Sequence, residues 1–152
     1  MLWQCTPYEM EERISLLVAN SLVAQYVQEQ WSTCILLYGI HDLLLDYLKS
    51  HMSAEEQRNA HRKLIDAYLN ECKSNFNDLP DDNYIFWFLG YHLYKAEYTE
   101  LFPKIYLNLS FISAKLRATG PSDLLNDFRK YKNYITKSVS TVVRVCIILC
   151  CV

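Results

Sequence analysis

Glycine is scarce in this sequence, which has three glycines among 152 residues, at positions 39, 90 and 120. Phosphate-binding loops of the G-x-x-x-x-G-K-[S/T] and G-x-G-x-x-G types need glycines within a few residues of each other, because the backbone must turn tightly around the phosphates. Neither pattern can be written with glycines this far apart. We therefore expect no cofactor to bind this chain alone through a nucleotide-binding loop.

Known catalytic and metal-binding patterns are missing as well. The sequence contains no G-x-S-x-G, H-E-x-x-H or C-x-x-C, and its six cysteines and four histidines do not stand at metal-ligand spacing. The carboxylate pairs Glu55 with Glu56 and Asp81 with Asp82 both stand where a helix is expected to begin, and helix capping accounts for them. We predict no catalytic residue, no metal ligand and no enzymatic activity.

Neither sign of charge dominates, since 15 basic and 17 acidic side chains leave a net charge of −2. That balance does not favour nucleic acid or an acidic membrane as partner. The first residues lack the basic start and apolar run of a signal peptide, so we expect a cytoplasmic protein with reduced cysteines.

Residues 138–152 form an apolar tail that differs from the rest of the chain. It is rich in β-branched residues, interrupted by Arg144, and too short to span a bilayer. Its fourth residue from the end is Leu149 rather than the cysteine of a prenylation box. The tail is left without an assignment, and no membrane partner is predicted.

The first fifty residues combine helix and strand signals. Thr6, Pro7 and Glu9 form a capping box with proline at the first helical position, so a helix is predicted from Pro7. Two segments rich in β-formers, 22–28 and 32–39, predict a β-hairpin, and a further helix is expected after His41. Helix, hairpin and helix in this order are typical of the end of a winged-helix unit.

From Ser53 onward the sequence predicts helices alone. Glu56 completes a capping box with Ser53, Gly120 and Pro121 mark the end of one helix and the start of the next, and Pro103 fits only a first helical turn. The segment 85–94 is apolar on nearly all sides and is predicted to be the central helix. The residues expected to be buried are Ala60, Leu64, Ala67, Tyr68, Cys72, Trp87, Phe88, Tyr91, His92, Tyr94, Leu124, Leu125, Phe128 and Tyr131. The predicted fold is mainly α: a partial winged helix with one β-hairpin, followed by an α-helical bundle.

Four segments in order carry a family resemblance: YGIHDLLLDYL, HRKLIDAYLNE, a stretch containing WFLGYHL (Trp87–Leu93), and one containing AKLRATGPSDLL (Ala114–Leu125). Over about residues 2–135 the chain resembles the apoptotic protease-activating factor family, in particular an invertebrate-like member. These proteins are ATP- and ADP-binding apoptosome scaffolds of the NB-ARC nucleotide-switch class. The resemblance implies that residues 1–50 are the C-terminal part of the winged-helix domain and residues 51–137 the helical domain that follows it.

The resemblance gives His41 a second possible role. The sequence Ile40-His41-Asp42 is similar to the Met-His-Asp motif that closes the winged-helix domain in this class, where the histidine donates a hydrogen bond to the β-phosphate of ADP. An imidazole N–H suits that task. His41 would act only together with the nucleotide-binding domain, which has no counterpart in this sequence. From the residues alone, a helix cap by Asp42 or the His-Asp junction is the alternative, and both readings stay open.

The family resemblance also implies a function. It points to a non-enzymatic scaffold segment that couples the nucleotide switch to the sensor domain in the regulation of caspase activation. The implied partners are proteins, namely the nucleotide-binding and propeller domains and other apoptosome protomers, with ADP or ATP as cofactor of the full-length family. A freestanding helical adaptor, or a short form acting as a dominant-negative inhibitor, is the alternative. A nucleic-acid-binding winged helix is disfavoured because Glu9, Glu11 and Glu12 would repel phosphates.

Overall fold

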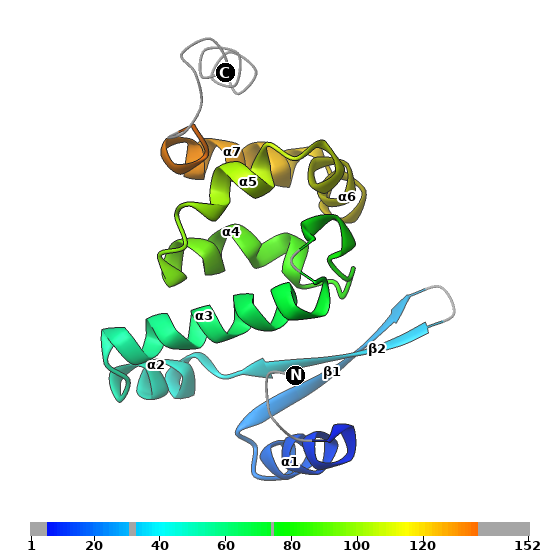
Figure 1. Cartoon of the computed structure of the whole chain (residues 1–152). Helices are drawn as coiled ribbons and strands as arrows, with labels where there is room; N and C mark the ends of the chain where they lie inside the picture. The colour runs from blue at the N-terminus through cyan, green and yellow to red at the C-terminus, as the bar shows by residue number, and fades with distance from the viewer. Residues whose placement is uncertain (1–5, 31–32, 74, 137–152) are drawn as a thin grey trace. The chain divides into compact units, whose positions relative to one another are not determined.

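The computed structural model describes residues 6–30, 33–73 and 75–136 (Figure 1). Within these ranges the chain forms seven α-helices, a short 3-10 helix and one antiparallel β-hairpin, which confirms the predicted mainly α fold with a single hairpin. The chain divides into two compact units, residues 1–57 and 58–152. The predicted tail, 138–152, lies outside the described residues.

The first unit contains α1 (Pro7–Ala19), β1 (Val23–Gln30), β2 (Thr33–Ile40) and α2 (Asp42–Ser50). The predicted capping box at the start of α1 is present: Thr6 N donates to Glu9 Oε2 at 2.7 Å, and Glu9 N donates to Thr6 Oγ1 at 3.3 Å. The two strands pair in register from Val23 opposite Ile40 to Gln30 opposite Thr33. None of the side chains described in this unit is buried.

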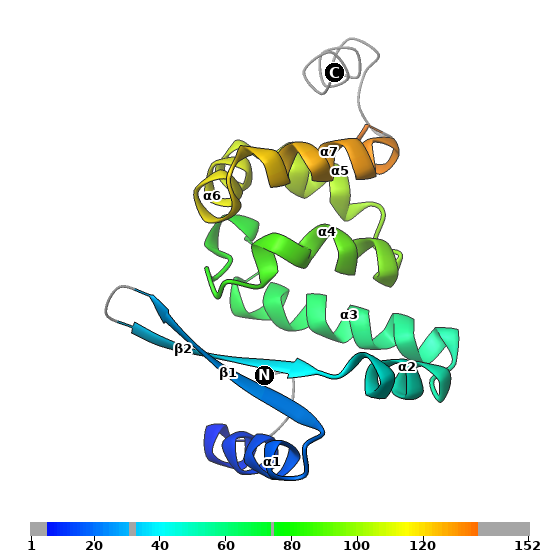
Figure 2. The same ribbon diagram turned by 180° about the vertical axis from the view of Figure 1, so that it is seen from behind.

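The second unit is helical and begins within α3 (Ala54–Glu71). After the 3-10 helix η1 (Phe76–Asp78) come α4 (Ile85–Ala96), α5 (Leu101–Tyr106), α6 (Leu109–Thr119) and α7 (Pro121–Ile135). The last four helices contact one another, and α4 lies between α3 and α5 in both views (Figures 1 and 2).

The predicted starts and stops of these helices agree with the structure. Ser53 and Glu56 form a reciprocal cap at the start of α3, with Ser53 N donating to Glu56 Oε2 at 2.8 Å. Pro103 lies in the first turn of α5, as expected. Gly120 has a positive φ of 84° and ends α6, and Pro121 then opens α7.

The central helix α4 is only half buried, which corrects the prediction for its aromatic residues. Trp87, Phe88, Tyr91 and Tyr94 were expected in the core, yet each is between 38% and 46% exposed. Neighbouring helices cover one side of α4 only, and these four rings lie on the other side. The buried residues of α4 are Ile85, Phe86, Leu89, Gly90, His92, Leu93 and Ala96.

Two further burial predictions need correction, both because the expected helix face was rotated by about one position. In α3 the buried residue is Ile65, whereas Ala60 is exposed and Leu64, Ala67 and Tyr68 are half-buried; Cys72, just beyond the helix, is buried as predicted. In α7 Leu124 and Tyr131 are buried as predicted, Phe128 is half-buried and Leu125 is exposed. The remaining buried positions of α7 are Asp127 and Ile135.

Candidate functional site

His41 caps α2 with its own ring. The backbone of His41 is extended, and its Nδ1 accepts a hydrogen bond from Leu43 N at 3.2 Å. Asp42 is instead the first residue of the helix. Its negative charge interacts favourably with the positive end of the helix dipole, but its side chain does not cap the helix. The cap that the sequence predicted is therefore present, and it belongs to His41 rather than to Asp42.

The capping bond also determines which nitrogen of His41 can donate. A neutral imidazole carries one proton, and a ring nitrogen that accepts a hydrogen bond cannot hold it. Because Nδ1 accepts from Leu43, we assign the proton of the neutral ring to Nε2. His41 is exposed. A single ring can thus cap the helix through one nitrogen and offer a donor through the other.

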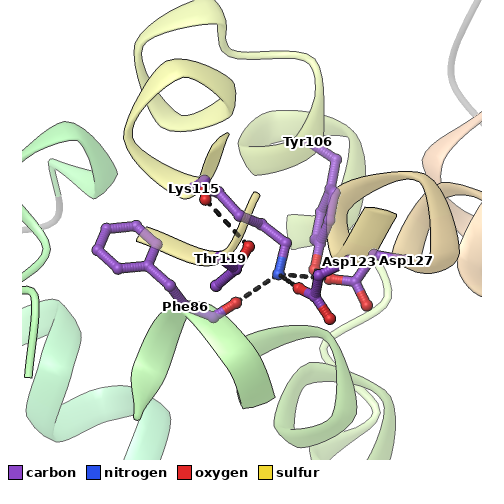
Figure 3. A network of polar contacts seen from close by, with 6 residues as sticks. All are labelled: Phe86, Tyr106, Lys115, Thr119, Asp123 and Asp127. Atoms are coloured by element: carbon purple, nitrogen blue, oxygen red, sulfur yellow. Dashed lines mark hydrogen bonds and ion pairs between the residues drawn. The ribbon is translucent and has the colours of Figure 1, made fainter. Parts of the chain in front are cut away.

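A second polar cluster lies in the core of the helical unit, centred on Lys115 of α6 (Figure 3). The Lys115 ammonium is fully buried and lies 2.6 Å from Asp123 Oδ2 and 3.0 Å from Asp127 Oδ2, both carboxylates belonging to α7. It also donates to the carbonyl oxygen of Phe86 in α4. Tyr106, at the end of α5, donates to Asp127 Oδ2 at 2.6 Å. We call these four side chains, Tyr106, Lys115, Asp123 and Asp127, the lysine cluster.

Burial determines the electrostatics of the lysine cluster. It raises the pKa of Asp127 above the usual range of a carboxyl, although the hydrogen bond from Tyr106 and the charge of Lys115 both oppose that rise. It also raises the pKa of Tyr106 well above that of a free phenol, and the charge of Asp127 adds to this effect. An ammonium group has three hydrogens, and Lys115 has three acceptors. Lys115 is therefore fully engaged and is placed to join helices rather than to act as a base.

A chain of hydrogen bonds connects two histidines and a tyrosine. The Nδ1 atoms of His61 and His92 are 2.8 Å apart, and His92 Nε2 lies 2.8 Å from Tyr84 Oη. Burial lowers the pKa of His92 to about 4, with a further contribution from His61. Burial, followed by the charge of Lys95, also lowers the pKa of His61. Both rings are neutral at pH 7, and His92 is the buried, hydrogen-bonded core histidine that the sequence predicted.

Sequence reasoning missed Lys115, Asp127 and His61, although a signal for two of them was present. Lys115 follows the buried Phe111 by one helical turn, and Asp127 stands between the buried Leu124 and Tyr131 at helical spacing. A charged residue on the apolar face of each of two consecutive helices is a recognisable pattern for a buried ion pair.

No three His, Cys, Asp or Glu residues within 6–30, 33–73 and 75–136 are grouped so that they could hold a metal ion. In the same part of the chain, no helix is long and apolar enough to cross a membrane.

The fold and the clusters together define a class: an α-helical domain, preceded by a helix–hairpin–helix unit, in which the buried polar side chains bind one another. The chain belongs to the family described as the APAF-1 helical domain, whose sequence model matches residues 57–147. This match covers the helical unit and extends beyond Lys137, near which the resemblance was expected to end, into the apolar tail.

The chain is also similar to full-length members of that family. It is 25% identical to apoptotic protease-activating factor 1 of Danio rerio over 144 residues, which are 93% of this chain and 11% of the relative. It is 24% identical to the Mus musculus protein and 23% identical to the Homo sapiens protein, in each case over 137 residues, 89% of this chain and 11% of the relative. The chain thus spans about a tenth of the length of these relatives.

Proposed function

We propose that this chain is a non-enzymatic scaffold segment of an apoptosome-type protein, coupling a nucleotide-switch domain to a sensor domain in the regulation of caspase activation. The observation that carries the proposal is the lysine cluster, found in a chain that belongs to the helical domain family. Among the side chains that the structure describes, no buried nitrogen or oxygen lacks a hydrogen-bond partner. Buried polar groups that bind one another in this way stabilise the helical unit, and they are not available to react with a substrate.

The lysine cluster supports a mechanical role because it joins four helices. Lys115 in α6 binds α4 through the Phe86 carbonyl and α7 through two carboxylates, and Tyr106 adds α5. Separating these helices would break a buried ion pair and leave a charge in the core without a partner. That cost holds the helices in one arrangement. A segment that moves as one body can transmit a displacement from one neighbour to the other, which is what coupling two domains requires.

Within this proposal His41 is the phosphate sensor, and it acts only with the nucleotide-binding domain of the family. Its Nε2–H would donate to the β-phosphate of ADP while Nδ1 keeps the helix cap. One hydrogen bond to a charged group contributes roughly 1.5–3 kcal/mol. Micromolar binding needs about 8 kcal/mol. The chain alone therefore takes no cofactor, and ADP or ATP belongs to the complete assembly.

The proposed partners are proteins: the nucleotide-binding and propeller domains of the parent family and neighbouring apoptosome protomers. The proposed location is the cytoplasm, where such an assembly would form. Nucleic acid and membrane are not proposed as partners, because the net charge of −2 gives no attraction to phosphate-rich surfaces.

The test presents the immobilised full chain with the nucleotide-binding domain of the Danio rerio relative loaded with ADP. We expect specific capture and slower release of ADP from the complex than from the nucleotide-binding domain alone. The His41→Ala chain should still be captured but should lose most of the slowing. His51→Ala is the matched control, since His51 is exposed at the opposite end of α2. ADP release that is the same with and without the chain would contradict the proposal.

The adaptor alternative has its own support in the exposed aromatic side chains of α4. As a freestanding adaptor, the chain would bind other proteins through these rings and ignore the nucleotide-binding domain. As a dominant-negative form, it would be captured by that domain and would lower caspase activation when added to a reconstituted assembly. Capture by the nucleotide-binding domain therefore separates the adaptor from the other two roles, and caspase activation separates those two from each other.

A further inference from the structure

A row of aromatic side chains runs along the exposed side of α4. Each of them lies three or four residues from another member of the row, which places them on one side of the helix. Each of these residues is between 38% and 46% exposed, so none of them is fully covered by the neighbouring helices. We call this surface the α4 aromatic face, and its residues are Tyr84, Trp87, Phe88, Tyr91 and Tyr94.

Several rings of this face contact other aromatic rings. The Tyr84 and Phe88 ring centroids are 4.9 Å apart, and the rings of His61 in α3 and Tyr91 form a T-shaped contact with their centroids 5.5 Å apart. At the other end, Tyr94 lies 5.9 Å from Tyr134 in the last turn of α7. The α4 aromatic face therefore ends beside the point where the chain leaves α7.

The chain that follows α7 has the composition that such a surface would bind. Eleven of the fifteen residues in 138–152 are Val, Ile, Leu or Cys, and Arg144 is the one charged residue among them. Apolar side chains gain free energy when they leave water, as do the exposed rings of α4. An arginine guanidinium is also a good partner for a tyrosine or tryptophan ring. The two surfaces are complementary in their chemistry.

The segment is also long enough and begins in the right place. From Tyr84 to Tyr94 a helix rises about 15 Å, at 1.5 Å per residue. An extended chain covers that distance in about five residues. The family match continues to residue 147, so part of this segment belongs to the same domain as α4.

We propose that residues 138–152 pack along the α4 aromatic face and complete the helical unit. The occupant is this chain's own segment rather than a second copy or another protein, because Tyr134 connects the face directly to it. In this arrangement the rings of α4 are covered in the full chain and become exposed when the segment is lost or displaced.

The experiment uses Trp87 as a reporter in the full chain. Replacing Trp3 and Trp31 with phenylalanine leaves Trp87 as the single tryptophan. In this background we compare acrylamide quenching of the full chain with that of a chain ending at Lys137. We expect the quenching constant to rise at least about twofold on truncation, with a red shift of the emission, because an uncovered indole meets water and quencher. Equal quenching in the two chains would overturn the proposal.

A point variant in the complete chain guards against misfolding of the truncated one. Ile148→Asp places a charge in the segment and should raise quenching as truncation does, while Ser140→Asp, a polar position in the same segment, should change it much less. Far-UV circular dichroism should remain unchanged in both. If tenfold dilution of the full chain alone raises quenching, a second copy covers the face and the proposal is wrong. Ile148→Asp without effect on Trp87 would overturn it equally.

Discussion

Lys115 Nζ lies 3.0 Å from Asp127 Oδ2, and both side chains are buried although they belong to consecutive helices, α6 and α7. The turn between these helices is the single residue Gly120. Its positive φ of 84° allows α7 to start at once in a new direction, so that Asp123 and Asp127 face Lys115. Gly120 and the two ion pairs of Lys115 therefore stabilise the angle between the two helices.

Removal of the lysine should be the most damaging single change in this cluster. Lys115→Ala leaves two carboxylates without a cation in the core, and loss of one partner of a buried pair costs about 3–5 kcal/mol. We expect the free energy of unfolding in urea to fall by that amount. The control is Arg117→Ala on the exposed side of the same helix, which should change stability by less than about 0.5 kcal/mol. Equal effects would show that Lys115 does not hold the helices together.

The sequence predicted the starts and stops of elements well because those signals are local. The capping boxes at Thr6 and Ser53 and the Gly120-Pro121 break depend on residues within one turn of each other. The burial of α4 could not be predicted in the same way. Which side of an apolar helix is covered depends on where α5, α6 and α7 cross it, and no pattern within 85–96 contains that information.

The contacts of the candidate site also differ in whether they are local or long-range in sequence. The cap role of His41 depends on Leu43, two residues away, and a cap at the His-Asp junction was expected from the sequence. In the lysine cluster, Lys115 connects the Phe86 carbonyl with Asp127, and elsewhere a hydrogen bond joins His61 with His92. His61 and His92 are 31 positions apart, and Lys115 and Phe86 are 29 positions apart, so the tertiary fold brings them together. The sequence carries a signal for the pair of Lys115 and Asp127, which lie on consecutive helices, but none that identifies Phe86 or His61 as a partner.

The two hydrogen-bonded histidines, His61 and His92, predict a loss of stability in mild acid. The pKa of His92 is about 4 in the folded protein, below the value of about 6.5 expected in the unfolded chain. The unfolded state therefore binds protons more readily, and the stability present above pH 6.5 is lost as the pH falls toward 4. The lowered pKa of His61 acts in the same direction. We expect the melting temperature to fall between pH 7 and pH 5.

His92→Gln tests this origin, because glutamine can hydrogen-bond to His61 and Tyr84 but does not titrate. The variant should lose most of the decrease between pH 7 and pH 5, while the exposed His51→Ala variant should keep it. Carboxylates with lowered pKa values, such as Glu9 and Glu56, lose their contribution at more acidic pH and do not affect this window. A decrease that is unchanged in His92→Gln would assign the acid sensitivity to other groups.

At Gly90 we expect a change to alanine to destabilise the protein, although alanine normally stabilises a helix relative to glycine. Alanine is normally favoured over glycine inside a helix by about 0.5–1 kcal/mol. A Cβ at position 90, however, would lie 2.5 Å from Tyr131 Cε2 and 2.7 Å from Tyr106 Oη. Gly90→Ala should therefore destabilise the protein by roughly 1–3 kcal/mol, because the two tyrosines are themselves buried.

A double-mutant cycle separates this clash from any other effect of the methyl group. Tyr131→Leu removes the ring that the new Cβ would meet, so Gly90→Ala should cost much less in the Tyr131→Leu background than in the original chain. Thermal or urea unfolding of the four proteins provides the comparison. Additive effects would mean that the contact between α4 and α7 tolerates a side chain at position 90.

Isothermal titration of the full chain with ADP and with ATP should give no binding heat at micromolar protein concentration. His41 offers one donor, and a single charge-assisted hydrogen bond of about 1.5–3 kcal/mol cannot hold a nucleotide in solution. Lysozyme, which has no part in nucleotide binding, serves as a control for non-specific heat. Saturable heat with a micromolar dissociation constant would show that the chain contains a nucleotide site of its own.

The two roles of His41 can be separated by the choice of substitution. His41→Ala removes both the cap and the donor. It should lower the stability by about 1 kcal/mol and should also fail to slow ADP release from the complex with the nucleotide-binding domain. His41→Ser keeps a capping oxygen but is too short to place a donor where Nε2 stands. It should therefore melt close to the original chain and still fail to slow ADP release. Asp42→Ala should reduce stability by about 0.3–1 kcal/mol through the helix dipole and leave ADP release nearly unchanged. If His41→Ser slows ADP release as the original chain does, His41 is a helix cap with no part in nucleotide sensing.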